Sequence, residues 1–129
     1  MDWDTLREAA IRAAGRAYAP YSHYPVGAAA VTDGGQLVTG CNVENASYGL
    51  TLCAECGLVS ALALSGGGQL VRFTCVDAQG QIITPCGRCR QVLYEFGGVS
   101  LEVLSPAGVV TLAELLGQAW GPEDLRSRG

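Results

Sequence analysis

The sequence of 129 residues predicts one α/β domain spanning residues 1–129, in which helices and short strands share a hydrophobic core. Two observations predict this fold class. First, 49% of the residues are hydrophobic and only 16% are charged, a composition typical of a compact globular chain. Second, segments with apolar residues at helical spacing alternate with short segments rich in β-branched residues. No internal repeat or linker interrupts this alternation, so we expect a single domain.

The first predicted element is a helix over residues 3–18. Its apolar residues recur at helical spacing, and Asp2 or Asp4 is placed to cap the first turn. These apolar residues are Leu6, Ala9, Ala10, Ala13 and Ala17. The helix is followed by an aromatic loop that Pro20 and Pro25 bound.

Two strands are expected next, over residues 26–32 and 36–43. Both runs are rich in strand-forming residues, and Asp33-Gly34-Gly35 between them suits a hairpin turn. A polar loop then covers residues 42–48, which is unusual in so apolar a chain. Such a loop is a candidate for binding polar groups of a ligand, although turn-capping contacts of its Asn side chains would also explain it.

The second half of the chain continues the alternation. Thr51 is the predicted cap of a second helix that runs to about residue 64 and ends at a run of three glycines. A third strand is expected over residues 70–77. Pro85 suits the first turn of a third helix, which Gly97-Gly98 closes.

The last predicted elements are short. A fourth strand is expected over residues 99–104 and a fifth at Val109-Val110. Thr111 and Glu114 have the spacing of a capping box for a last helix, which Gly121-Pro122 is expected to end.

Two cysteine-containing segments carry the strongest chemical signal. Glu55 follows Cys53 after one residue, and Cys86 and Cys89 lie one helical turn apart. Three thiolates suit zinc, and a site with three protein ligands leaves the fourth position to a water whose pKa the metal lowers to about 7. Glu55 is then a carboxylate beside that water rather than a ligand. The sequence therefore predicts a catalytic zinc site, with one Zn2+ per chain.

Cys56 keeps other interpretations open. It completes two Cys-x-x-Cys pairs, a pattern found in closed structural zinc sites and in redox dithiols. The 29 residues between the pairs exceed the roughly 15–20 that are usual in closed modules, and a closed site leaves Glu55 without a role. The open site is favoured, with Cys56 as a neutral thiol beside the metal.

The charge of the chain favours a small neutral substrate. The formal net charge is −4, which argues against nucleic acid as a partner, because that affinity comes mostly from neutralised phosphates. No predicted helix has the roughly 20 apolar residues needed to cross a membrane, and the acidic N-terminal residues do not resemble a secretory signal. We therefore expect a cytoplasmic location. Cys41 and Cys75 are expected to be buried in strands, and His23 to be a surface residue.

Four segments in order resemble the cytidine deaminase family, specifically its small homotetrameric class acting on free nucleosides. Residues 21–29 are similar to the aromatic loop that enters the first strand of that family, and residues 40–48 to its nucleoside-binding segment. Residues 52–55 and 85–91 match its two zinc segments. The resemblance covers nearly the whole chain.

This resemblance implies a fold, a reaction and an assembly. The fold is a three-layer α-β-α arrangement around a mixed sheet of about five strands. The reaction is zinc-dependent hydrolytic deamination of cytidine and 2′-deoxycytidine to uridine and 2′-deoxyuridine, with release of ammonia, in pyrimidine salvage. The assembly is a homotetramer whose active sites are shared between subunits.

The resemblance also assigns roles near the metal and the sugar. Cys53, Cys86 and Cys89 hold the zinc, and Glu55 moves protons as both base and acid. Asn42 and Glu44 hold the ribose hydroxyls. Because these two residues alternate at a strand end, their side chains are expected to point the same way.

Further roles concern the base and the subunit boundaries. The backbone N–H of Ala54 binds the pyrimidine carbonyl, and Tyr24 lies at the pyrimidine pocket, although it would equally anchor its loop. Ala46 and Tyr48 approach the sugar end of a neighbouring subunit's site. Trp120 covers the base from a neighbour; alternatively it closes its own helix against the core.

One departure from the family pattern concerns charge. The family often has arginine directly after the catalytic glutamate, where this chain has Cys56. Three thiolates around Zn2+ leave an excess of negative charge, so the offset must come from helix dipoles, from hydrogen bonds to the thiolates, or from Arg88 or Arg90.

The sequence leaves three alternative functions open. A relative on this scaffold that deaminates another aminopyrimidine compound, such as a nucleoside antibiotic, is the nearest. A polynucleotide-editing deaminase is disfavoured by the acidic charge. A zinc-stapled interaction module without activity is the third.

Overall fold

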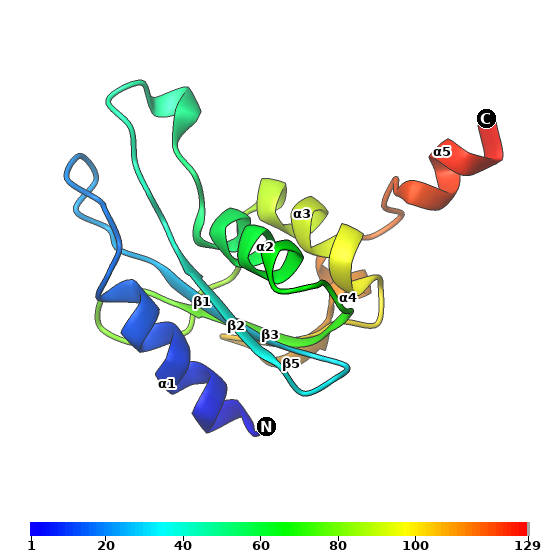
Figure 1. Cartoon of the computed structure of the whole chain (residues 1–129), viewed down its shortest axis with the longest axis horizontal. Helices are drawn as coiled ribbons and strands as arrows, with labels where there is room; N and C mark the ends of the chain where they lie inside the picture. The colour runs from blue at the N-terminus through cyan, green and yellow to red at the C-terminus, as the bar shows by residue number, and fades with distance from the viewer. Residues whose placement is uncertain (129) are drawn as a thin grey trace.

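The computed structural model describes residues 1–128 and has a five-stranded sheet with helices on both faces (Figure 1). The strands lie in the order β2-β1-β3-β4-β5, and only the β3–β4 pair is parallel. Their bounds are Gly27–Thr32 (β1), Leu37–Cys41 (β2), Leu70–Val76 (β3), Glu102–Ser105 (β4) and Gly108–Thr111 (β5). The predicted three-layer α-β-α arrangement around a mixed sheet is confirmed.

One face of the sheet is covered by α1, Trp3–Ala14. Asp2 caps it, because the backbone N–H of Thr5 donates to Asp2 Oδ1 at 2.8 Å. The prediction that this helix reaches residue 18 is wrong, because its last residue is Ala14 and Gly15 is its C-cap. The backbone N–H of Tyr18 donates instead to the carbonyl of Asn42 at 3.0 Å, a contact that a continued helix would not allow.

The opposite face is covered by α2 (Ala54–Leu64) and α3 (Gly87–Gly97), with the short α4 (Leu112–Leu115) beside them (Figure 1). The larger hydrophobic core lies between these helices and the sheet, and a smaller one lies under α1. β1 is buried along its whole length, because it has a helix on each side and a strand on each edge.

Two glycines let helices lie directly on the sheet. A Cβ on Gly27 would overlap the backbone of α1 at Ala10 and Ala14. A Cβ on Gly40 would overlap the backbone of α2, at Ala54 and Leu58. The absent side chains therefore set the distance of both helices from the sheet, and Gly40 sets it for the helix that Cys53 precedes and whose first turn carries Glu55.

The starts of α2 and α3 differ from the prediction. Thr51 is not the cap of α2; its hydroxyl accepts the backbone N–H of Asn45, and Cys53 occupies the N-cap position. Pro85 is not in the first turn of α3, because it precedes the N-cap residue Cys86. Both N-cap cysteines have extended backbones, so each helix begins one residue after a predicted zinc ligand.

The C-terminal region also differs. The backbone N–H of Thr111 donates to Glu114 Oε1 at 3.4 Å, as the predicted capping box requires, but α4 ends at Leu115. Gly121-Pro122 does not end that helix. Pro122 begins a separate helix, α5 (Pro122–Arg128), where its fixed φ suits the first turn, and α5 extends away from the sheet (Figure 1).

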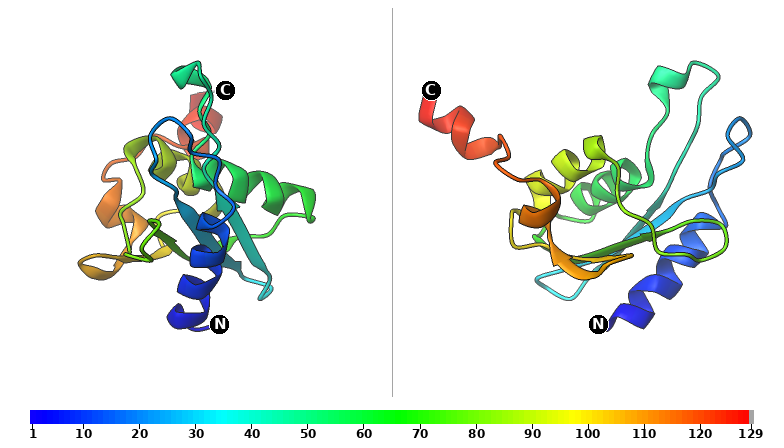
Figure 2. Two further views of the ribbon diagram at one scale, coloured as in Figure 1. Left: turned by 90° about the vertical axis from the view of Figure 1, so that its left-hand side faces the viewer. Right: turned by 180° about the vertical axis from the view of Figure 1, so that it is seen from behind.

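Two connections extend from the same end of the sheet. Residues 15–26 and 42–53 leave the body side by side in the views of Figure 2, and the second contains the 3₁₀ turn η1, Tyr48–Leu50. The rings of Tyr21 and Tyr48 join them, with centroids 6.1 Å apart. Among the described residues, no helix has the length and hydrophobicity needed to span a bilayer.

Candidate metal centre and substrate cavity

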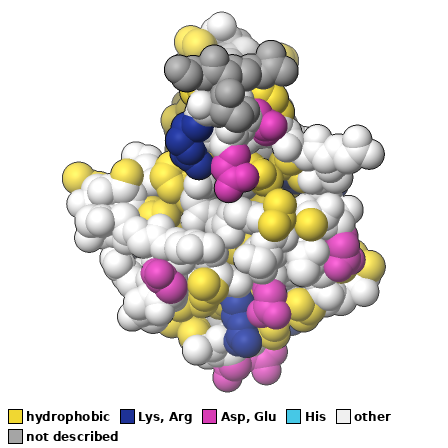
Figure 3. Space-filling model, turned by 90° about the vertical axis from the view of Figure 1, so that its right-hand side faces the viewer, with side chains coloured by type: hydrophobic (Ala, Val, Ile, Leu, Met, Phe, Trp, Pro, Cys, Tyr) yellow, Lys and Arg dark blue, Asp and Glu magenta, His cyan; other side chains and the backbone are white. Residues whose placement is uncertain are grey.

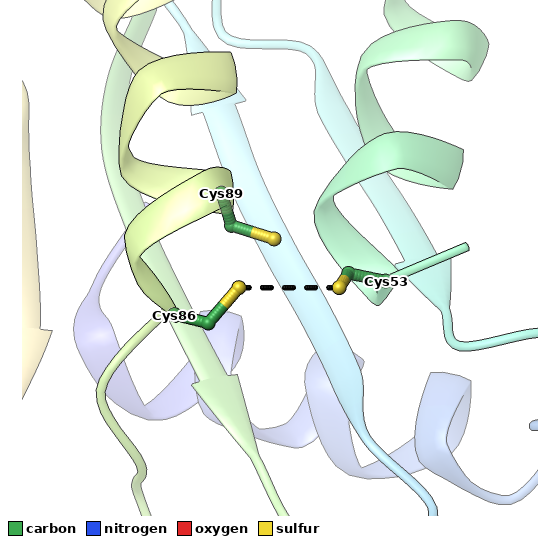
Figure 4. Close-up of side chains that lie close together, drawn as sticks. All are labelled: Cys53, Cys86 and Cys89. Carbon is green, nitrogen blue, oxygen red and sulfur yellow. Dashed lines mark hydrogen bonds between the residues drawn. The ribbon is translucent and has the colours of Figure 1, made fainter. Parts of the chain in front are cut away.

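The three predicted zinc ligands converge from two helix starts (Figure 4). Cys53 precedes the first residue of α2, Cys86 precedes that of α3, and Cys89 lies in the first turn of α3. Their sulfur atoms all lie within 4.8 Å of one another, and those of Cys53 and Cys86 are 4.0 Å apart. Sulfurs at about 2.3 Å from a tetrahedral zinc ion are separated by ~3.8 Å, so this arrangement fits the metal.

The first turns of α2 and α3 begin at this cluster. Neither Cys53 nor Cys86 makes a side-chain cap, and the first N–H groups of a helix have no acceptor within it. The positive ends of the α2 and α3 dipoles therefore face the sulfurs. This arrangement favours negative charge on the cysteines.

Glu55 lies in the first turn of α2 and is only 3% exposed. Burial raises the pKa of its carboxyl, whereas a hydrogen bond with Cys89, its own backbone and the charge of Arg88 act in the opposite direction. A carboxyl whose pKa is raised by burial holds a proton more readily than an exposed one. Its position between the sulfurs and the cavity suits proton transfer.

Burial opposes ionisation of two of the three cysteines. Burial raises the pKa of the Cys89 thiol, and the nearby Glu55 carboxylate raises it further. Burial likewise raises the pKa of the Cys53 thiol. Zinc stabilises the thiolate form against both effects, so binding of the metal displaces protons from this cluster.

A cavity of about 330 Å³ opens beside Glu55. Its size suits one small ring system. Five other predicted site residues line it: Cys53, Cys86, Ala54, Asn42 and Tyr24. The remaining wall is Val26, Thr51, Cys75, Ile83, Thr84 and Pro85.

Asn42 is fixed in this wall by two hydrogen bonds. Its Oδ1 accepts the backbone N–H of Val26 at 2.8 Å, and its Nδ2 donates to the carbonyl of Tyr24 at 3.0 Å. One amide hydrogen is therefore left for a ligand. The turn-capping contact considered for this loop occurs at Asn45, whose Oδ1 accepts the backbone N–H of Ser47 at 2.9 Å.

Glu44 lies in a neighbouring cavity of about 440 Å³, lined also by Tyr21, Ser22, Tyr48 and Thr51. Its carboxylate accepts the backbone N–H groups of Tyr21 and Ser22 at 2.9 and 3.1 Å and the hydroxyl of Ser22. The bond from the Ser22 side chain lowers the pKa of Glu44, so the carboxylate stays ionised. Asn42 and Glu44 thus line two cavities that share Thr51.

The other predicted substrate residues are exposed. Tyr48 is 74% exposed, and Ala46 is exposed on the same loop. Trp120 is 56% exposed and lies between α4 and α5, where its carbonyl accepts a hydrogen bond from Gln91 at 2.8 Å. The alternative that Trp120 closes its own helix against the core is therefore wrong. Tyr24 is half exposed and lines the first cavity.

Arg88 and Cys75 have contacts at the site that the sequence did not establish. Arg88 Nη2 lies 3.1 Å from the carbonyl of Thr51 and 3.6 Å from Cys53 Sγ. Cys75 is buried as predicted, but it also lines the cavity, and its Sγ donates to the carbonyl of Ile83 at 3.2 Å. The strand pattern predicts that Cys75 is buried, but it does not predict that Cys75 lines the cavity.

Cys56 lies outside the group of three converging sulfurs. Its Sγ lies 3.8 Å from Arg88 Nη2 instead. This placement favours the open three-cysteine site over the closed four-cysteine site.

A larger cavity, of about 660 Å³, lies between the end of α3 and α5. Its ionisable lining residues are Tyr94, Glu95, Glu123 and Arg126, and it contains no cysteine. On the face shown in Figure 3, the few charged side chains are scattered over a mostly uncharged surface, and the basic ones lie beside acidic ones. Neither this cavity nor this surface has the combination of converging cysteines and a buried carboxyl that the cavity at Glu55 has.

Comparison with known proteins agrees with this geometry. A family model of the cytidine and deoxycytidylate deaminase zinc-binding region matches residues 2–104. The cytidine deaminase of Mycobacterium tuberculosis is 55% identical over 125 residues, which cover 97% of this chain and 94% of that protein.

Solved structures show the same similarity. The crystal structure of cytidine deaminase from Mycobacterium tuberculosis matches with a TM-score of 0.91 and covers 94% of this chain and 98% of that one. Cytidine deaminase from Mycobacterium leprae matches with a TM-score of 0.90 and 57% identity, covering 92% and 99% of the two chains.

Proposed function

Because the chain belongs to the cytidine and deoxycytidylate deaminase family, we propose that it catalyses the hydrolytic deamination of cytidine and 2′-deoxycytidine. The products are uridine or 2′-deoxyuridine and ammonia, which is a reaction of pyrimidine salvage. One observation carries the proposal: three cysteine sulfurs converge beside the buried Glu55 at the wall of a cavity of about 330 Å³.

Cys53, Cys86 and Cys89 would hold the zinc ion. When bound, zinc supplies a Lewis acid that lowers the pKa of a water to about 7. The burial of Cys89 and the helix starts at Cys53 and Cys86 keep the three sulfurs in position for it.

Glu55 moves the protons of the reaction. It takes a proton from the attacking water and delivers it to N3 of the pyrimidine, while the water oxygen bonds to C4. It then carries the second proton of that water to the exocyclic amino group. The C4–N4 bond breaks, ammonia leaves, and C4 retains the oxygen as a carbonyl.

Four groups orient the base and the sugar. The backbone N–H of Ala54, in the first turn of α2, donates to the pyrimidine carbonyl. The remaining amide hydrogen of Asn42 and the carboxylate of Glu44 bind ribose hydroxyls. Tyr24 lies against the pyrimidine ring. Glu44 already accepts three hydrogen bonds, which leaves it about one acceptor site for a hydroxyl.

The proposed assembly is a homotetramer in the cytoplasm, with sites completed by neighbouring subunits. Tyr48, Ala46 and Trp120 support this because they are exposed on segments that extend from the body, and neither Ala46 nor Trp120 lines the cavity beside Glu55. Large exposed aromatic residues are typical of interfaces between chains. Sedimentation velocity of active protein tests the assembly, and a fully active monomer would contradict it.

The activity test mixes zinc-quantified protein with cytidine and follows the loss of cytidine absorbance. Conversion to uridine by protein with one zinc per chain is the expected result. Zinc-loaded protein that leaves both nucleosides unchanged would overturn the proposed substrates. The assay would then be repeated with nucleoside antibiotics that carry an aminopyrimidine.

A further inference from the structure

The metal centre has more negative groups than its own helix starts can balance. Three thiolates and the Glu55 carboxylate lie together, against one divalent cation. The two helix dipoles contribute about half an elementary charge each. Excess negative charge on the ligands weakens the Lewis acidity that the reaction needs, so a further positive group is required.

Arg88 is the cation whose contacts meet this requirement. It lies between the ligands Cys86 and Cys89 in sequence, yet its guanidinium reaches across to the segment before α2. Its Nη2 lies 3.6 Å from Cys53 Sγ and 3.8 Å from Cys56 Sγ. A bond to the carbonyl of Thr51 at 3.1 Å fixes the guanidinium in this position. N–H donors to sulfur withdraw charge from a ligand without occupying a coordination position.

Arg90 does not share this role. Its Nε donates to the carbonyl of Pro85 at 2.9 Å, and its Nη1 donates to the carbonyl of Leu115 at 2.8 Å. These contacts hold the start of α3 against the end of α4. Of the two arginines beside Cys89, only Arg88 faces a ligand sulfur.

We propose that Arg88 is a positioning residue that offsets the thiolate charge of the metal centre, through N–H···S contact with Cys53 and a fixed guanidinium beside Cys56. This inference rests on the proposed zinc-dependent deamination and deepens it. Arg88 also joins the two ligand-bearing segments independently of the metal, because the Thr51 carbonyl and Cys53 lie on one segment and Arg88 on the other.

The test compares Arg88→Gln with wild type in two measurements. In cobalt-substituted protein, loss of the N–H donor raises the energy of the sulfur electrons, so the thiolate-to-cobalt charge-transfer band should move to longer wavelength. In zinc protein, kcat for cytidine should fall about 10- to 100-fold, which is typical for loss of an outer partner of a metal ligand, and KM should change much less. Arg12→Gln, which removes an exposed arginine from α1, is the matched control and should change neither.

A charge-relocation variant separates charge from shape. Cys56→Arg combined with Arg88→Gln moves the guanidinium from α3 to α2. The two positions are in contact, because Arg88 Nη2 lies 3.8 Å from Cys56 Sγ in the native protein. The double variant should return the cobalt band toward its native position and recover much of the lost kcat. Arg88→Lys should give an intermediate band, because it keeps the charge but loses the planar fork.

An unmoved cobalt band with kcat within about twofold of wild type in Arg88→Gln would overturn the proposal. A double variant without any recovery would also overturn the charge role. The cobalt band does not depend on turnover. Wild-type protein that binds metal but does not deaminate cytidine would therefore contradict the proposed function, while the band would still test Arg88.

Discussion

The two faces of the sheet use the same packing device for different purposes. On each face a helix lies directly on a glycine, α1 on Gly27 and α2 on Gly40. The start of α1 is capped by the side chain of Asp2, whereas α2 and α3 begin at Cys53 and Cys86 without a side-chain cap. An N-cap side chain normally stabilises a helix. On the face of α2 and α3 that contribution is absent, and the helix starts lie at the proposed metal centre instead.

This difference between the two faces predicts which substitutions affect stability and which affect catalysis. The core under α1 consists of small and aliphatic side chains and serves the fold. The core under α2 and α3 is larger and ends at the cavity with Glu55. We therefore expect changes on the two faces to separate stability from catalysis.

The largest expected effect is that of Glu55→Gln. We expect zinc to be retained and kcat to fall about 10²–10⁴-fold, because one carboxylate moves every proton of the reaction. Steady-state kinetics with metal analysis measures this. Glu8→Gln, the same change on an exposed position of α1, is the control and should leave kcat unchanged. Retention of more than about a tenth of the turnover would contradict the role of Glu55.

Removal of the metal should affect one face. Cys86→Ala or chelation should increase amide hydrogen exchange in the first turns of α2 and α3, because the ion joins the two helix starts. Protection in α1 and β1 should be largely kept. Cys41→Ala, on β2 and outside the sulfur cluster, is the control variant and should keep zinc. Equal loss of protection on both faces would show that the faces are not energetically distinct.

The two glycine contacts provide a matched pair. Gly27→Ala and Gly40→Ala each force a helix away from the sheet, so each should lower the free energy of unfolding by about 1–3 kcal/mol. Only Gly40→Ala should also reduce kcat in the folded protein, because α2 carries Cys53 and Glu55. Urea unfolding and kinetics on the same samples measure both. A comparable loss of kcat in Gly27→Ala would remove the distinction.

The smallest expected effect is that of Asp2→Ala, which should lower Tm slightly and leave kcat unchanged. The N–H of Thr5 lowers the pKa of Asp2 in the folded chain. A lowered folded pKa stabilises the fold above the unfolded pKa, and this contribution disappears as pH falls through the folded pKa. The Tm difference from wild type should therefore be constant near neutral pH and vanish in acid. A Tm difference that persists in acid would contradict the cap.

Local patterns predicted the elements well and their ends less well. The helices around residues 3–14, 54–64 and 87–97 were expected from apolar spacing and glycine stops. The predicted starts of the second and third helices, at Thr51 and Pro85, are wrong. A threonine cap and an N1 proline are the usual signals, whereas here two predicted zinc ligands occupy the N-cap positions. The last helix is predicted to continue to Gly121-Pro122, whereas α4 ends at Leu115, and α5, which begins at Pro122, is not predicted at all.

The sequence by itself determined the candidate metal ligands, the carboxylate close to one of them and the family to which the chain is similar. Cys86 and Cys89 are one turn apart in any helix, and Glu55 is two residues from Cys53 in any fold, so the helical period and the chain order suffice for these features. Only the tertiary structure decided which groups meet across the chain. Cys53 and Cys86 are 33 residues apart in sequence, and their sulfurs lie 4.0 Å apart because α2 and α3 pack on one sheet. The same packing brings Arg88, and not Arg90, to the sulfur of a predicted ligand. The sequence does not distinguish these two arginines, because their contacts depend on which segments pack beside α3.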